Sequence, residues 1–114
     1  MVIGKHKAET VDKLGGCGKG NAQLYHWLGD SPACPNLALL STITLERGAT
    51  VGDHAHHGEA EVYFITQGSG EYNDNGKTVD VAAGDVTICY KEETHGLKNT
   101  GDGELVFHAI IIEG

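Results

Sequence analysis

The stretch that decides the fold is GATVGDHAHHGEAEVYFITQG, residues 48–68, which has a glycine at each end. His54 and His56 stand two residues apart, and residues i and i+2 of an extended strand point to the same face. Glu61 follows a bend at His57-Gly58 and opens EVYFIT, a run rich in strand formers. Two imidazoles and one carboxylate that meet at one point suit a borderline divalent metal with open coordination positions. The stretch therefore predicts a metal site.

Length and charge limit the classes of protein that fit. The chain has 114 residues, which is enough for one domain. Its formal net charge is -8, from 16 acidic and 8 basic residues, and no basic cluster is present. We therefore expect neither nucleic acid nor an anionic membrane surface as a partner. Arg47 is the only arginine, which excludes a clamp of two arginines on a phosphate.

Location is predicted from apolar runs and cysteines. The apolar runs are only a few residues long, so we expect no membrane span. The first twenty residues lack the apolar region of a secretion signal. The cysteines are odd in number and widely spaced, which favours reduced thiols in a cytoplasmic protein. They are Cys17, Cys34 and Cys89.

The chain from Leu37 onward has turn signals at intervals of about ten residues, a spacing typical of a sandwich or barrel. Asn73-Asp74-Asn75-Gly76 predicts a hairpin, because these residue types tolerate positive φ. No convincing amphipathic helix is found. We predict an all-β, antiparallel, closed or nearly closed fold, with residues 37–114 as the barrel and residues 1–36 as an N-terminal arm of the same domain. The expected barrel strands are LALLSTITLE, EVYFIT, EYN, KTVDV, VTICY, HGLKN and ELVFHAIII.

The N-terminal arm offers one strand and no binding motif. GGCGKG at residues 15–20 matches neither the phosphate-loop nor the dinucleotide pattern, so we expect a flexible loop. AQLYHWLG at residues 22–29 is a predicted strand in which His26 has a structural role. Pro32 and Pro35 indicate turns before Leu37.

Tyr63 is a candidate catalytic residue, because it shares strand parity with Glu61. Its phenol could act as acid, base or hydrogen-bond donor to a substrate, or it could simply fill interior volume. His57 and Glu59 are expected at the rim or in solvent. His108, in VFHAIII, can lie on either face of the last strand.

Two segments resemble the two sequence motifs of the cupin superfamily. The first has the order Gly48, five residues, His54-x-His56, four residues, Glu61, six residues and Gly68. The second spans residues 84–99 and contains Gly84-Asp85, His95 and Asn99. It departs from the family, which usually has proline and glycine where this chain has Tyr90 and Glu92. The motifs and the hairpin between them cover about half of the chain.

The resemblance implies a single-domain cupin, an antiparallel jelly-roll barrel also called a double-stranded β-helix. It implies a divalent metal ion (Mn, Fe, Co, Ni or Zn) bound inside by His54, His56, Glu61 and His95. It also implies a homodimer, in which the N-terminal strand often crosses to the partner.

Several functions fit such a centre. Three imidazoles and one carboxylate leave two cis positions open in an octahedron and give a net charge of +1, which favours a small bidentate anion. One class is a metalloenzyme, a decarboxylase, lyase or dioxygenase, acting on a small carboxylate or keto/enol compound. Glu92, Glu93 or Lys91 could supply a proton donor or cation to it. The other class is a non-catalytic metal-dependent module that binds a small molecule or a sugar.

The predicted barrel interior narrows the choice of ligand. Its apolar strands favour small dicarboxylates, 2-oxo acids or enediolates over sugars, whose hydroxyls would each need a partner. A sugar-phosphate isomerase is a further alternative, which the single arginine disfavours.

Overall fold

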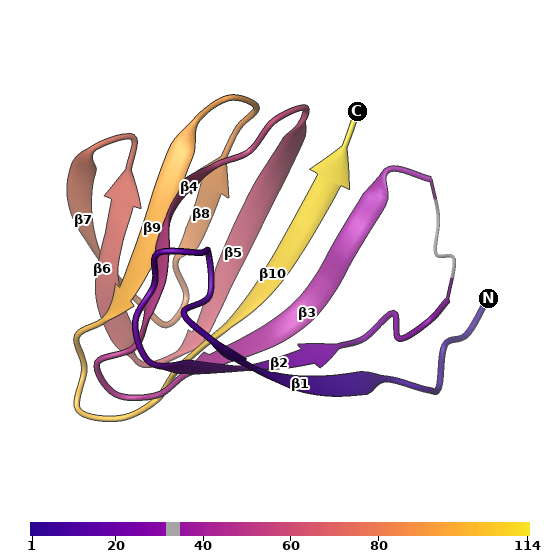
Figure 1. Cartoon of the computed structure of the whole chain (residues 1–114), viewed down its shortest axis with the longest axis horizontal. Helices are drawn as coiled ribbons and strands as arrows, with labels where there is room; N and C mark the ends of the chain where they lie inside the picture. Colours follow the sequence, from indigo (N-terminus) through magenta and orange to yellow (C-terminus); the bar gives the residue numbers. More distant parts are fainter. Residues whose placement is uncertain (32–34) are drawn as a thin grey trace.

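The computed structural model of the protein describes residues 1–31 and 35–114, which form ten strands in two antiparallel sheets (Figure 1). The six-stranded sheet has the order β1 (Lys7–Asp12), β2 (Asn21–His26), β3 (Leu37–Leu45), β10 (Leu105–Glu113), β5 (Glu59–Gln67) and β8 (Val86–Cys89). The four-stranded sheet has the order β4 (Thr50–Ala55), β9 (Thr94–Asn99), β6 (Ser69–Asp74) and β7 (Lys77–Ala82). Pro32 and Cys34, expected in a turn and as a reduced thiol, lie outside the described residues.

The strands of residues 37–114 pair in a nested order. β3 pairs with β10, β4 with β9, β5 with β8, and β6 with β7, all antiparallel. A long hairpin that pairs in this way and winds round itself is a jelly roll. The all-β, antiparallel prediction is therefore confirmed. Within the described residues there is no helix that could cross a membrane.

The core lies between the two sheets and follows from period-two alternation along each strand. On β3 and β10 alternate side chains are buried, such as Ile43, Leu45, Leu105 and Phe107. The four-stranded sheet adds apolar side chains such as Leu97 from its own inner face. The polar residues that share this interior are therefore costly to place there, and they mark the candidate site.

The β6–β7 hairpin forms where the sequence predicts it. Its turn contains Asn75 and Gly76, whose φ angles are 52° and 91°. The Asn73 side chain accepts a hydrogen bond from the Gly76 amide at 2.7 Å, which closes the turn. The turn residues therefore have the positive φ that their types tolerate.

The N-terminal region differs from the prediction in two respects. β1 was not expected, and it pairs with β2 as the exposed edge of the six-stranded sheet. The flexible loop expected at residues 15–20 is instead fixed against β4. The Gly52 amide donates to the Leu14 carbonyl and the Thr50 amide donates to the Lys19 carbonyl, both at 2.8 Å.

The close approach of this loop to β4 explains its glycines. A Cβ on Gly15 would lie 2.8 Å from the Gly52 oxygen, and a Cβ on Gly18 would overlap the Leu14 and Thr50 carbonyl oxygens. Gly15 also has a φ of 81°, which favours glycine. The glycine-rich segment is therefore a packing contact, and its pattern is unrelated to phosphate binding.

Candidate metal centre

Four side chains predicted as metal ligands lie together between the sheets. His54 lies on β4, His56 directly follows it, His95 lies on β9 and Glu61 lies on β5 of the facing sheet. His54 and His95 are direct partners in the β4–β9 register. One ligand atom from each of the four residues lies within 4.8 Å of all the others. The fold thus unites residues that are up to 41 positions apart in the chain.

A bulge in β4 directs His54 into the interior. Val51 pairs with Leu97 and His54 pairs with His95, so β4 has one more residue than β9 between these two pairs. Val51 and His54 therefore both line the inner cavity, although simple alternation would point them to opposite faces. Gly52 lies in the bulge, where a side chain would collide with the loop at Cys17 and Gly18.

The ligand atoms converge at distances that suit a single ion. The three Nε2 atoms are 3.1 Å apart between His54 and His56, 3.0 Å between His56 and His95, and 3.2 Å between His95 and His54. Glu61 Oε1 lies 2.9 Å from Nε2 of His56 and 3.0 Å from Nε2 of His95. Ligands ~2.1 Å from one ion, with bonds at right angles, lie ~3.0 Å from each other. The donor set therefore fits a divalent transition metal.

The opposite ring nitrogens are held by three different partners. Nδ1 of His54 lies 2.6 Å from the Gly52 carbonyl oxygen, and Nδ1 of His56 lies 2.8 Å from Glu59 Oε1. Nδ1 of His95 lies 2.8 Å from the Tyr72 hydroxyl. Donation from Nδ1 to these oxygens leaves the Nε2 lone pair of each ring free to face the centre. The carbonyl and the carboxylate can only accept, so they fix the tautomer of His54 and His56, and the Tyr72 hydroxyl holds the orientation of the His95 ring.

Protonation states at the centre also suit metal binding. Burial alone raises the pKa of Glu61, but without an ion the Nε2 atoms of His54 and His95 can carry a proton, and their hydrogen bonds to Glu61 outweigh burial and lower that pKa to about 2. Burial lowers the pKa of His95, whereas the hydrogen bond to Glu61 raises the pKa of His54. Glu61 is therefore ionised at neutral pH, and His95, only 1% exposed, favours its neutral form.

Tyr63 lies beside the centre, on the face that strand parity predicts. Its ring stacks on His95, with centroids 4.9 Å apart and planes inclined by 24°. Burial, followed by the nearby Glu61 carboxylate, raises the pKa of Tyr63 well above its usual range. The hydroxyl is therefore protonated at neutral pH and acts as a hydrogen-bond donor, with the Glu61 carboxylate as its acceptor when no ligand is bound.

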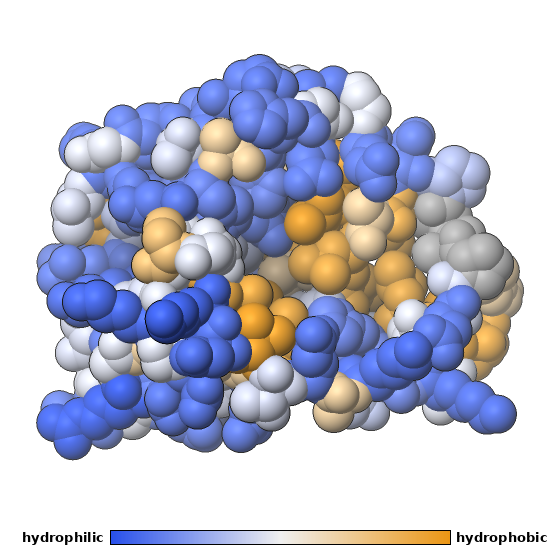
Figure 2. Space-filling view, viewed as in Figure 1, coloured by the Kyte–Doolittle hydropathy of each residue, from blue (hydrophilic) through white to orange (hydrophobic). Residues whose placement is uncertain are grey.

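A cavity of about 220 Å³ adjoins the centre. Its polar lining comes from His54, His56, Glu61 and Tyr63, and among the described residues no lysine or arginine lines it. Figure 2 shows apolar side chains gathered in a hollow over β3 and β10, with hydrophilic side chains around it. The aliphatic walls are Leu14, Leu24, Leu39, Ile43, Val51 and Ile111. Leu14 directly precedes the glycine-rich loop, and Gly15 of that loop also lines the cavity, so this segment contributes to the site.

Two histidines outside the centre have structural contacts. His26 bonds Ser41 and Glu9, as its predicted structural role requires. His108, which the sequence left unassigned, alternates with buried Phe107 and contacts the Thr42 hydroxyl. Neither belongs to the metal cluster.

The chain after His56 contains one confirmed prediction and one contact that was not predicted. His57 is exposed and pairs with Glu92, in agreement with its predicted position outside the centre. Glu59, expected at the rim, is partly exposed and not part of the cluster, but it also contacts His56. Strand parity gave no indication of this contact, because Glu59 and His56 lie on either side of the bend.

The loop considered as a source of catalytic groups does not serve the cavity. Glu92 accepts hydrogen bonds from His57 and the Gly58 amide. Glu93 accepts hydrogen bonds from the Tyr90 amide and the Asn75 side chain. Lys91 donates to the terminal Gly114 carbonyl. None of these three charged residues lines the cavity, so the geometry gives no support to their suggested roles as proton donor or cation.

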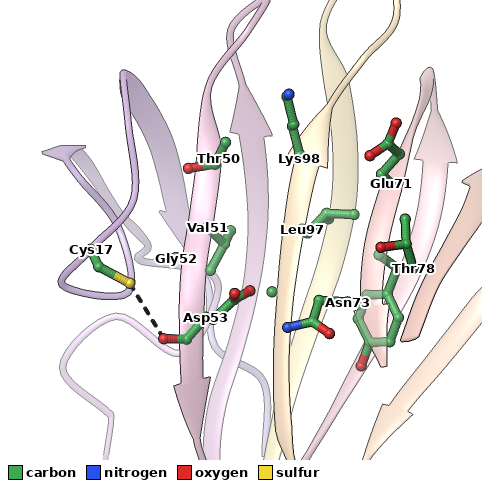
Figure 3. Close-up of a pocket in the computed structure, with 12 residues that line it drawn as sticks. Cys17, Thr50, Val51, Gly52, Asp53, Glu71, Asn73, Thr78, Leu97 and Lys98 are labelled. Carbon is green, nitrogen blue, oxygen red and sulfur yellow. Dashed lines mark hydrogen bonds between the residues drawn. The ribbon is translucent and has the colours of Figure 1, made fainter. Parts of the chain in front are cut away.

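A separate polar groove of about 260 Å³ lies on the outer face of the four-stranded sheet (Figure 3). Asp53, Glu71, Asn73, Thr78 and Lys98 contribute its polar side chains. The Cys17 thiol donates to the Asp53 carbonyl oxygen at 3.4 Å and ties the glycine-rich loop to this edge. The groove shares no residue with the metal cluster.

Comparison with known proteins agrees with this geometry. The oxalate-binding protein of Thermotoga maritima is 38% identical over 104 residues, which cover 91% of this chain and 85% of that protein. The crystal structure of a Thermotoga maritima protein, named as a predicted oxalate decarboxylase, matches with a TM-score of 0.91 and 36% identity over 100% of both chains. KdgF from Halomonas sp. shares the fold, with a TM-score of 0.68 and 19% identity over 82% of this chain and 80% of that one. Residues 41–111 match the model of the cupin domain, and the chain belongs to the cupin family.

Proposed function

We propose that the protein binds one divalent metal ion through His54, His56, Glu61 and His95 and uses it to bind a small anionic oxygen compound. The observation that carries this proposal is the convergence of three Nε2 atoms and one carboxylate oxygen inside the sandwich, with every Nδ1 already held by an oxygen. Similarity to an oxalate-binding protein supports the choice of a small anion.

The donor set accepts Mn, Fe, Co, Ni or Zn, and availability would select among them. A dipositive ion with the Glu61 carboxylate has a net charge of +1, which favours an anion. When bound, such an ion polarises carboxylate or carbonyl oxygens as a Lewis acid. The protein contributes by fixing the imidazoles and by keeping Glu61 ionised.

The cavity walls limit the ligand to a small molecule with few polar groups. A ligand there finds aliphatic side chains and the Tyr63 hydroxyl in addition to the cluster. A sugar would leave buried hydroxyls without partners, which is costly. A small dicarboxylate or 2-oxo acid satisfies its oxygens at the metal, so these are the ligand classes we favour.

Tyr63 is the proposed hydrogen-bond donor to that ligand and, if the protein is an enzyme, its acid–base residue. We place ligand binding before catalysis because, apart from the metal cluster, the described lining of the cavity offers only this acid–base side chain. Decarboxylase, lyase or dioxygenase chemistry is the alternative. A sugar-phosphate isomerase is disfavoured, because no lysine or arginine of residues 1–31 and 35–114 lines the cavity.

Calorimetric titration tests this function. Oxalate and a short 2-oxo acid should bind the metal-loaded protein and should not bind the protein after chelation. Glucose serves as the neutral comparison and should not bind either form. Equal binding of oxalate with and without metal, or tight binding of glucose, would contradict the proposal.

A homodimer is also part of the proposed function. In the described part of the chain, the outward side chains at the centre of the six-stranded sheet include no aspartate, glutamate, lysine or arginine, although the chain carries a net charge of -8. These side chains are Leu40, Thr42, Val62, Phe64, Val86, Ile88, His108, Ile110 and Ile112. Two such chains repel each other, and the repulsion is smallest when they meet over a surface without charged side chains. A second copy of the chain is therefore the occupant we favour for this face.

Sedimentation equilibrium tests the dimer. The wild type should sediment as a dimer, and Phe64→Glu should sediment as a monomer that retains its metal, because Phe64 is exposed and lies outside the cluster. A wild-type monomer would contradict the dimer, and an unchanged dimer in Phe64→Glu would contradict this choice of interface.

A further inference from the structure

Two neighbouring histidines form similar contacts with carboxylates in different surroundings. Nδ1 of His56 lies 2.8 Å from Glu59 Oε1, and Nδ1 of His57 lies 2.8 Å from Glu92 Oε2. The His56 side chain is only 6% exposed, whereas the His57 side chain is 79% exposed. His56 directs its other nitrogen to the metal cluster, and His57 is not part of that cluster.

Glu59 also distinguishes His56 from the other two imidazoles of the cluster. His54 faces a backbone carbonyl and His95 faces a phenol, which are both neutral partners. Only His56 has a charged acceptor behind it. A carboxylate on the remote nitrogen holds the ring and increases the basicity of the nitrogen that faces the metal.

The charge of Glu59 has a second consequence. Ionised Glu61 and a dipositive ion together have a net charge of +1, and ionised Glu59 behind His56 reduces the local sum to zero. A negative charge this close attracts a cation and repels an anion, because surrounding protein screens it less than bulk water does.

We propose that Glu59 is a positioning residue that strengthens metal binding through His56 and weakens the binding of anions at the same centre. This inference rests on the proposed metal site and extends it, because it assigns the balance between metal retention and anion affinity to one residue outside the ligand set. The site thereby holds its ion firmly and exchanges its anionic ligand readily.

A purely structural role for Glu59 has a different expected outcome. Glu59→Gln keeps the length of the side chain and an oxygen that can accept from Nδ1 of His56, but it removes the charge. If Glu59 only holds the bend in place, this variant should behave as the wild type. If its charge matters, metal affinity and anion affinity should change in opposite directions.

The test is a titration of chelator-treated protein with Co²⁺, followed through the visible absorption bands of the bound ion. In Glu59→Gln the Kd for Co²⁺ should rise by ~10–100-fold, the range found when an outer partner of a metal ligand is removed. Acetate is then added to each protein saturated with Co²⁺. Its Kd should fall by roughly three- to tenfold in Glu59→Gln, because one nearby negative charge is gone.

Glu92→Gln is the matched control, because it removes the charge from the neighbouring carboxylate–histidine pair. Both of its dissociation constants should equal those of the wild type. Unchanged or jointly weakened binding in Glu59→Gln, or equal shifts in the two variants, would overturn the role of Glu59. Failure of the wild type to bind Co²⁺ would overturn the metal site itself, and the first titration reveals this before any variant is made.

Discussion

His95 and His108 show how two similar histidines differ in their chemical setting. Each lies on a strand, and each has Nδ1 2.8 Å from a hydroxyl oxygen, that of Tyr72 for His95 and that of Thr42 for His108. Nε2 of His95 lies within 3.2 Å of two other imidazoles and of Glu61. His108 lies on the opposite face of its sheet from the core. A contact between Nδ1 and a hydroxyl therefore does not identify a histidine as a metal ligand. The distinguishing feature is that Nε2 of His95 lies close to other ligand atoms.

The largest expected effect is the loss of metal binding when the inner histidine is removed. His95→Ala removes a ligand, so its Kd for Co²⁺ should rise by well over the ~100-fold that loss of an outer partner can cost. His108→Ala should bind Co²⁺ as the wild type does. Equal losses of Co²⁺ affinity in both variants would contradict the different roles assigned to His95 and His108.

Acid stability of the metal-free protein tests the carboxylate that faces the inner histidines. The pKa of Glu61 is about 2 in the folded protein, compared with 4.5 as the ordinary value. Ionised Glu61 therefore stabilises the fold above pH 4.5, and this contribution is lost as the pH falls from 4.5 to 2. A shift of this size corresponds to about 3 kcal/mol.

Denaturant unfolding of the chelated wild type and of Glu61→Gln measures this contribution. The difference between their free energies of unfolding should be largest near neutral pH and should shrink towards pH 2. Glu9→Gln is the control, because Glu9 contacts the outer histidine His26 in a largely exposed pair. A difference for Glu61→Gln that does not depend on pH would contradict the lowered pKa.

Metal should stabilise the fold only when the inner histidines are intact. An ion that binds the folded state alone adds about 2.7 kcal/mol to the free energy of unfolding at a free concentration of 100 times Kd. Thermal unfolding with Co²⁺ and with chelator should show this stabilisation in the wild type and in His108→Ala. His95→Ala should unfold at the same temperature in both conditions. If the Tm of the wild type does not change after metal loss has been confirmed, metal binding does not stabilise the fold and the prediction is wrong.

The smallest effect on stability is expected at Tyr63, which stacks on the inner histidine. Tyr63→Phe keeps the ring and removes one hydroxyl, so the free energy of unfolding should change by ~1 kcal/mol or less, with metal content intact. If the hydroxyl performs acid–base catalysis, turnover should fall by ~10²–10⁴-fold. Loss of metal in this variant would instead indicate that Tyr63 holds His95 in position for metal binding.

The sequence was sufficient to predict the fold and the members of the cluster, for physical reasons. Turn residues at short intervals and alternating apolar residues indicate β-strands locally, and the spacing of His54, His56 and Glu61 resembles a family motif. His95 required the second motif, because no local pattern connects it with β4.

Features that depend on contacts between distant segments were not predicted. The β4 bulge, which changes the parity between Val51 and His54, is visible only in the register with β9. The contact of Tyr72 with His95 joins residues 23 positions apart, and the contact of Glu59 with His56 depends on the bend between them; neither Tyr72 nor Glu59 has a distinctive local pattern. The glycine-rich loop was interpreted as flexible, because the strand that it packs against lies over 30 residues further along the chain.

Anomalous X-ray diffraction from crystals of the Co²⁺-loaded protein would locate the bound ion. We expect one strong anomalous peak per chain, ~2.0–2.3 Å from Nε2 of His54, His56 and His95 and from a carboxylate oxygen of Glu61. A peak at His26, His57 or His108 with none between the sheets, or no peak at all in fully loaded protein, would contradict this expectation.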